Sequence, residues 1–186
     1  MNRSYKIAAV VAFALIGSSC IKEKLELTYT SQEDKIDSYI NSNKYTDSSK
    51  TDSLRVVYNG GACRMVMTEG IGDELKSDGV IYFYYAGYTF TGSGPNRNYL
   101  FTTNHEQTAK SAGWELTDAN YDLLKLNMSD ASLLPGLRNG LIGVRGGEHC
   151  QILFSGKYGY GNKQFGIIPA NTALLYEIWV EAVSNE

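Results

Sequence analysis

The sequence offers little from which a metal or redox site could be built. Its 186 residues include only three cysteines and two histidines. Cys63 and Cys150 form no CxxC pair, and with only His105 and His149 available a zinc site has no support in the sequence. We therefore expect no metal and no cofactor. An oxidising compartment would permit a disulfide between Cys63 and Cys150, but their spacing leaves the pairing open.

Positive charge and catalytic polar sets are scarce as well. The chain has 17 lysines and arginines against 20 aspartates and glutamates, a formal net charge of −3. This balance gives no general electrostatic reason to bind nucleic acid, and it argues against a polybasic contact with anionic lipid. The sequence also presents no Ser-His-Asp set, no paired carboxylates and no lysine-bearing phosphate loop.

Only one long apolar run occurs, and it lies at the start of the sequence. Residues 7–16 (IAAVVAFALI) follow Arg3 and Lys6 and precede three small residues. The run is shorter than the roughly 20 apolar residues of a membrane-spanning helix, and its flanks are those of a signal peptide. Cys20 comes next, in a pattern that resembles a bacterial lipobox. We predict cleavage after residue 19 and lipidation of Cys20. The acyl chains would attach the protein to the outer membrane of the cell envelope, either on its periplasmic face or at the cell surface.

Residues 20–53 are mostly polar, which is typical of a tether. Ser31 and Asp34 resemble a capping box, and apolar residues at i, i+3, i+4 spacing follow, so we predict a short helix over residues 32–41. Those apolar residues are Ile36, Tyr39 and Ile40. We expect this helix to pack against its own domain, with binding to a partner protein as the alternative.

Aromatic and β-branched segments predict the strands that follow. Fourteen tyrosines and an aromatic share of 12% favour strands over a helical bundle. Residues 54–58 and 62–67 predict a β-hairpin, because the Asn-Gly pair at 59–60 readily adopts the positive φ angles of a two-residue turn. Residues 80–90 and 150–154 predict two further strands.

The last predicted strand, residues 174–181, has the clearest alternation. Leu174, Tyr176, Ile178 and Val180 alternate there with Leu175, Glu177, Trp179 and Glu181. Successive side chains of a strand point to opposite faces of the sheet. We expect the first set to face the core, and the two glutamates to place the second set toward water.

One short helix is predicted between the strands. Pro135 suits the first helical position, Leu137 and Leu141 share a face, and Gly143 ends the helix. Five to six strands around one short helix make an α+β domain, which we place over residues 54–186.

Three groups of residues, in this order, carry a family pattern. They are Tyr85-Ala86-Gly87-Tyr88 with Phe101; Leu133-Leu134-Pro135-Gly136-Leu137, continuing through Gly140-Leu141 and Gly147-Glu148; and Tyr158-Gly159-Tyr160-Gly161, then Gly166 to Asn171, Leu174 and Tyr176. Together they resemble the FKBP-type peptidyl-prolyl cis/trans isomerase domain over residues 62–183. The resemblance implies a twisted antiparallel sheet wrapped around one short helix, with an apolar pocket between them.

The resemblance also implies two sets of site residues. The catalytic set is Tyr85, Phe101, Leu134, Tyr160, Ile168 and Tyr176. The substrate-binding set is Leu124, Leu133, Leu137, Phe165 and Ile167. The aromatic residues would form the pocket walls, Leu137 the floor, and Ile167 and Ile168 the loop edge. The Tyr160 hydroxyl and the Leu134 N–H would hydrogen-bond substrate carbonyls.

The implied activity is rotation about X-Pro bonds in proline-containing peptides or unfolded envelope proteins, and it needs no metal or cofactor. The sequence departs from the pattern of active members at Leu137, where Trp is typical, at Leu124, where Phe is typical, and at Thr102, where Asp is usual. A long insert over residues 102–123 contains Trp114, which could form a flap over the pocket. The alternative function is therefore a catalytically silent FKBP-like lipoprotein domain that binds a peptide or protein partner.

Overall fold

The computed structural model describes residues 4–46, 48–115 and 117–185, with the backbone alone described for residues 4–20, 118 and 119. Within these residues one sheet of seven strands runs antiparallel throughout, in the order β1-β2-β6-β7-β3-β4, with β5 pairing with β3. The strands are β1 (Val56–Asn59), β2 (Ala62–Thr68), β3 (Val80–Thr89), β4 (Leu100–Thr103), β5 (Leu124–Asn127), β6 (His149–Phe154) and β7 (Leu174–Ser184). The helices are α1 (Ser4–Asn43), α2 (Glu106–Ser111) and α3 (Pro135–Leu141), with short 3-10 turns η1 (Arg97–Tyr99), η2 (Asp118–Tyr121) and η3 (Gly156–Tyr158).

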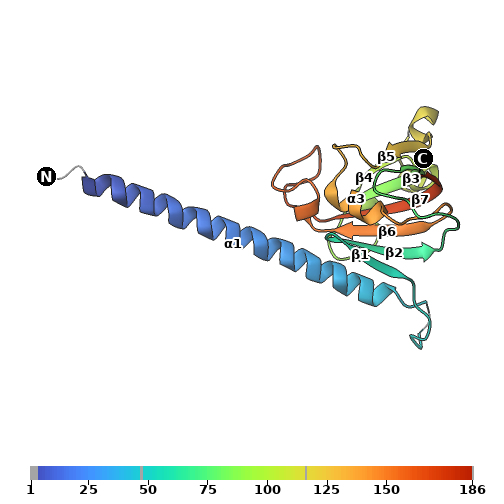
Figure 1. Cartoon of the computed structure of the whole chain (residues 1–186), viewed down its shortest axis with the longest axis horizontal. Helices are drawn as coiled ribbons and strands as arrows, with labels where there is room; N and C mark the ends of the chain where they lie inside the picture. Colours follow the sequence, from blue (N-terminus) through green and yellow to red (C-terminus); the bar gives the residue numbers. More distant parts are fainter. Residues whose placement is uncertain (1–3, 47, 116, 186) are drawn as a thin grey trace.

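The sheet separates two apolar layers, with α3 on one face and α1 on the other (Figure 1). Leu137 and Leu141 of α3 belong to the first layer, and Ile36 and Ile40 of α1 belong to the second. The predicted α+β class, an antiparallel sheet around one short helix, is confirmed. The sequence pattern did not identify β4 and β5, and these two strands bring the total to seven in the described chain.

The β1-β2 hairpin turns one residue later than predicted. Asn59 pairs with Ala62, so the turn residues are Gly60 and Gly61, with φ angles of 52° and 84°. Two consecutive positive φ angles define the hairpin turn that matches the twist of the strands, and glycine adopts them without steric cost.

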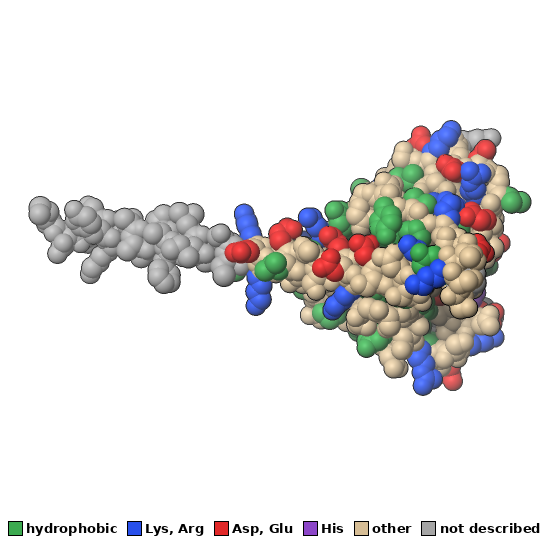
Figure 2. All heavy atoms as spheres, turned by 90° about the horizontal axis from the view of Figure 1, so that it is seen from below, with side chains coloured by type: hydrophobic (Ala, Val, Ile, Leu, Met, Phe, Trp, Pro, Cys, Tyr) green, Lys and Arg blue, Asp and Glu red, His purple; other side chains and the backbone are tan. Residues whose placement is uncertain are grey.

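The α1 helix is far longer than the predicted 32–41 segment, since it runs over Ser4–Asn43. Tyr39 and Ile40 are buried against the sheet together with Ile36, and the Tyr39 hydroxyl donates to the Gln151 side chain at 2.7 Å. The exposed surface of the described helix is mostly polar apart from Ile21 and Leu27, and Figure 2 shows acidic and basic side chains along it. Packing of one face, rather than propensity along its whole length, stabilises such a helix.

Among the residues that the structure describes, no helix combines the length and the apolar character needed to cross a membrane. The side chain of Cys20, the predicted lipidation site, lies outside the described residues.

The covering helix also explains a wrong prediction on β7. The set Leu174, Tyr176, Ile178 and Val180 is buried as predicted. Leu175, which was expected to face water, is only 1% exposed because it lies in the layer beneath α1. An antiparallel sheet that is covered on both faces shows weaker alternation than one with a wet face.

The two described cysteines are free, and they lie on opposite faces of the sheet. Cys63 belongs to the layer under α1, and Cys150 belongs to the layer under α3. Side chains on opposite faces of one sheet point away from each other, so the disulfide that the sequence left open does not form in this fold.

The long insert does not cover the cavity described below. Trp114 packs against the layer under α1, near Ala112 and the end of α2. Trp114 therefore does not form the flap that was predicted, and among the described residues of the insert 102–123 only Thr102 lines the cavity.

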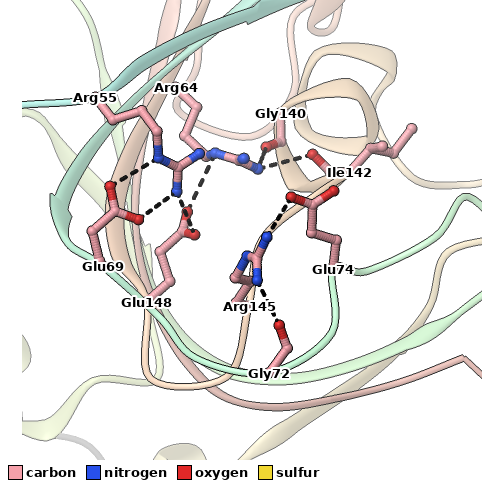
Figure 3. Close-up of polar contacts among 9 residues, drawn as sticks. All are labelled: Arg55, Arg64, Glu69, Gly72, Glu74, Gly140, Ile142, Arg145 and Glu148. Carbon is pink, nitrogen blue, oxygen red and sulfur yellow. Dashed lines mark hydrogen bonds and ion pairs between the residues drawn. The ribbon is translucent and has the colours of Figure 1, made fainter.

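A buried ion pair fixes the end of α3 (Figure 3). Arg64 of β2 donates from Nη1 to the carbonyl oxygens of Gly140 at 2.8 Å and Ile142 at 2.9 Å. Its Nε lies 3.3 Å from Oε1 of Glu148, and both side chains are almost fully buried. Because the last carbonyl groups of a helix lack partners within it, this arginine caps α3 from the sheet.

A second arginine extends the same cluster to the surface. Arg55 contacts Glu69 at 2.7 Å and Glu148 at 3.3 Å (Figure 3). Glu148 thus has two positive neighbours, one buried and one half-exposed. The cluster ties β2 to the turn before β6 and to α3, which carries part of the cavity described next.

Candidate functional site

The cavity between α3 and the strands β3, β4, β5 and β7 has a volume of about 320 Å³. Its lining is largely apolar and aromatic: Phe83, Tyr85, Phe101, Thr102, Leu124, Leu126, Ser132, Leu133, Leu134, Leu137, Tyr160, Phe165 and Tyr176. This volume lies at the small end of the range for ligand pockets, which suits a single side chain or a short peptide segment.

The cavity walls come from the strands β3, β4, β5 and β7, and on β3 and β5 every second side chain points toward the cavity. Phe83 and Tyr85 are two residues apart on β3, so they share one face. Leu124 and Leu126 have the same relation on β5, which pairs with that part of β3. Tyr176 of β7 lies behind them, with its ring 6.5 Å from that of Tyr85.

The floor comes from α3 and the residues before it. Pro135 occupies the first turn of the helix, after which Leu137 faces the cavity. Gly136 allows the helix to approach the sheet, since a Cβ atom there would lie only 2.2 Å from the ring of Phe154. Leu133 and Leu134 precede the helix and close the rim.

Tyr160 comes from the long connection between η3 and β7, and its ring stacks on that of Phe165. The ring centroids are 4.5 Å apart and the planes differ by 5°. Phe165 is 58% exposed, so its outer face is open to solvent at the cavity mouth. Each stacked ring covers one face of the other, so the outer faces and the ring edges remain available to an apolar group.

The polar groups of the cavity are few, and they are mainly phenols. The Tyr85 hydroxyl lies 3.3 Å from the Thr102 hydroxyl, so Thr102 retains a polar contact where the resemblance expects an aspartate. Burial raises the pKa of Tyr176 and of Tyr160, and a hydrogen bond between these two hydroxyls acts in the opposite direction on Tyr160. Both phenols are therefore neutral near pH 7 and can donate a hydrogen bond.

Nine of the eleven predicted site residues line this cavity. They are Tyr85, Phe101, Leu124, Leu133, Leu134, Leu137, Tyr160, Phe165 and Tyr176. Ile167 and Ile168, which were predicted to edge the cavity, do not line it: Ile167 is 76% exposed, and Ile168 is buried in the adjoining core. Mutual hydrogen bonds between the backbones of Phe165 and Ile168 form a tight turn there, which directs Ile167 outward.

Four lining residues were not predicted as site residues: Phe83, Thr102, Leu126 and Ser132. Strand alternation was a sufficient signal for Phe83 and Leu126, because each lies two residues from a predicted wall residue. Ser132 precedes the predicted rim and carried no signal of its own.

This arrangement suits the binding of an apolar group beside a few hydroxyl groups. Within the part of the chain that the structure describes, no three His, Cys, Asp or Glu side chains are grouped to hold a metal ion. The cavity can accept an apolar cyclic group while a few hydroxyl groups hydrogen-bond a peptide backbone.

Comparison with known proteins gives one family and a consistent set of structures. The family model described as FKBP-type peptidyl-prolyl cis-trans isomerase matches residues 72–181. FK506-binding protein 1 of Aspergillus oryzae is 25% identical over 118 residues, which cover 63% of this chain and 94% of that protein.

Two bacterial crystal structures have a similar fold. FkpA from Escherichia coli aligns with 98% of this chain and 73% of its own, with a TM-score of 0.54 and 18% identity. A peptidyl-prolyl cis-trans isomerase from Pseudomonas syringae pv. tomato aligns with 86% of this chain and 96% of its own, with a TM-score of 0.56 and 15% identity.

Proposed function

Since the chain belongs to the FKBP-type peptidyl-prolyl cis-trans isomerase family, we propose that it is an isomerase or folding helper of the bacterial cell envelope that rotates X-Pro bonds in the cavity beside Tyr160. The observation that carries this proposal is the apolar cavity itself, walled by Tyr85, Tyr160 and Tyr176 and open at Phe165.

The chemistry requires no nucleophile. Rotation about a peptide bond must break amide resonance, against a barrier of about 18–20 kcal/mol. The planar amide is more polar than the twisted one, so a site poor in water disfavours the ground state relative to the transition state. In this mechanism the proline ring lies on the aromatic walls above Leu137, and the Tyr160 hydroxyl and the Leu134 N–H hold the neighbouring carbonyl groups.

The departures from the family pattern are compatible with this mechanism. Leu137 gives a smaller floor than tryptophan but an equally apolar one. Thr102 keeps a polar contact with Tyr85, and Trp114 packs on the other face of the sheet, away from the cavity.

The cis-to-trans conversion of proline tetrapeptides, measured without a coupling protease, tests the catalytic part. We expect acceleration by the whole chain and a loss in kcat/KM of about fivefold in Tyr160→Phe, because one hydrogen bond contributes about 1 kcal/mol. Tyr99→Phe is the matched control, since Tyr99 is a partly exposed tyrosine in η1 and does not line the cavity. No acceleration with any of several residues before proline would refute catalysis.

The envelope part of the proposal depends on Cys20. We expect the chain to incorporate a labelled fatty acid in bacterial cells and to sediment with membranes, and Cys20→Ser to abolish both. A Cys20→Ser chain that is still labelled and still sediments would remove this part and leave the catalytic part untouched.

A silent peptide-binding domain is the second candidate, and the smaller side chains at Leu137 and Leu124 favour it. Calorimetric titration with the same proline peptides separates the two functions. Binding without acceleration supports the silent domain, whereas acceleration supports the isomerase.

A further inference from the structure

We infer that helix α1 is part of the isomerase machinery, because Gln32 fixes the loop that carries Tyr160. The helix lies outside the residues matched by the family, and it runs beside η3, where this loop begins (Figure 1). The loop spans residues 156–171 and supplies the aromatic wall of Tyr160 and Phe165. The effect on catalysis rests on the proposed function, whereas the effect on the loop can be measured without it.

The two ends of the loop meet at a crowded junction. A Cβ atom on Gly156 would lie 2.5 Å from the carbonyl carbon of Asn171, so only glycine fits this approach. The half-buried side chain of Gln32 bridges the junction. Its Nε2 donates to the Asn171 carbonyl oxygen at 2.6 Å, and its Oε1 accepts from the Gly156 N–H at 2.9 Å.

The same two residues hold the backbone beside Tyr160. The Gly161 N–H donates to the Gly156 carbonyl oxygen at 2.9 Å, and the Asn171 N–H donates to the Gly161 carbonyl oxygen at 2.6 Å. Gln32 therefore binds two residues that in turn bind Gly161, the residue that follows Tyr160. This gives a path of hydrogen-bonded residues from α1 to the backbone beside Tyr160.

Asn171 has a second contact with α1, through its side chain. Its φ angle is +58°, a left-handed conformation that asparagine adopts more readily than most residues with a side chain. The Tyr29 hydroxyl, one turn before Gln32 on α1, donates to the Asn171 Oδ1 at 2.8 Å. Two further contacts join α1 to the start of the loop: Ser155 to Glu33 at 3.0 Å and Lys157 to Glu26 at 3.4 Å.

Gln32 is thus a positioning residue. It does not line the cavity, and it acts on Tyr160 through Gly161. A shift of a catalytic group by about 1 Å can lower the reaction rate about 100-fold. Because Gln32 of α1 binds both ends of the loop that carries Tyr160, the helix affects the activity through the position of this loop.

The variant Gln32→Glu in the whole chain tests the inference. At pH 7.5 it keeps the size and the acceptor but replaces the donor by a carboxylate oxygen facing the Asn171 carbonyl. We expect the backbone amides of Gly161 and Asn171 to exchange with solvent about tenfold faster than in wild type at the same pH, and kcat/KM to fall severalfold. At pH 4, below the ordinary glutamate pKa of about 4.3, most of the carboxyl groups are protonated and can donate again, so both differences from wild type should shrink.

Two further variants complete the experiment. Gln107→Glu makes the same chemical change on the exposed surface of α2 and should match wild type at both pH values. Tyr29→Phe removes only the contact to the Asn171 side chain and should give a smaller increase in exchange at Asn171, independent of pH.

Unchanged exchange at Gly161 and Asn171 in Gln32→Glu at pH 7.5 would overturn the inference, as would an increase that does not depend on pH. Faster exchange with an unchanged kcat/KM would overturn the link to catalysis. If the wild-type chain does not accelerate isomerisation, the proposed function fails, and the exchange measurements still decide whether α1 orders the loop.

Discussion

Replacing Arg64 by methionine removes the positive partner of a buried carboxylate. The Arg64 and Glu148 side chains are 3% and 0% exposed, and their charged groups lie 3.3 Å apart. Methionine has a similar length and no charge, so the variant leaves the Glu148 carboxylate without its buried partner and the carbonyl groups of Gly140 and Ile142 without their donor.

The structure gives the size of the expected loss. Breaking a buried ion pair by removing one partner costs about 3–5 kcal/mol, and Arg55, still 3.3 Å from Glu148, places this charge effect at about 3 kcal/mol. The lost hydrogen bonds to the end of α3 add about 1 kcal/mol. A total of about 4 kcal/mol is a large part of the 5–15 kcal/mol that is typical of a domain.

Urea denaturation, followed by the fluorescence of the half-buried Trp114 and Trp179, measures this loss. Adding Glu148→Gln to Arg64→Met removes the unpaired charge and should recover at least about 1 kcal/mol, because contacting residues are strongly coupled. A loss below about 1 kcal/mol in Arg64→Met, or a double variant equal to the sum of the two single ones, would refute the reasoning.

Three further predictions concern other buried groups. Burial raises the pKa of Cys63 to about 12 and also raises that of Cys150, so alkylation at pH 8, located by peptide mass spectrometry, should label neither thiol until urea unfolds the chain. Burial lowers the pKa of His105, so protonation of this side chain disfavours the folded state. The urea midpoint of the wild type should therefore fall as the pH drops below about 6.5, whereas the midpoint of His105→Gln should not change over the same step. Gly136→Ala should lower the urea midpoint, with a loss of about 1–3 kcal/mol, because its Cβ atom meets the ring of Phe154.

Sequence patterns were sufficient for the strands that are long and buried. The aromatic run predicted β3 to within one residue, and the alternation along β7 predicted that strand except for its last three residues. They were insufficient for β5, whose four residues are mostly exposed and so leave no periodic pattern. They also underestimated α1, because it is stabilised by docking onto the domain at positions such as Tyr29 and Ile40, which the polar composition around them obscured.

The candidate site was predictable only through the family pattern. Composition alone does not distinguish Tyr85 or Tyr176 from ordinary core aromatics, whereas the ordered motifs placed both in one pocket. The motifs could not give the orientation of Ile167, which depends on hydrogen bonds within its own turn. The contribution of Gln32 was equally invisible, since it depends on how two loop ends approach each other.

The order of the strands has a consequence for how the chain folds. β2 pairs with β6 although residues 69–148 separate them, and β3 pairs along most of its length with the last strand, β7. Pairing between such distant segments slows folding, because a large loop must close before the contact forms. The hairpin of β1 and β2 can therefore join the sheet only after β6 has been synthesised, and the complete sheet forms late. Until then its unpaired edge needs protection from other chains.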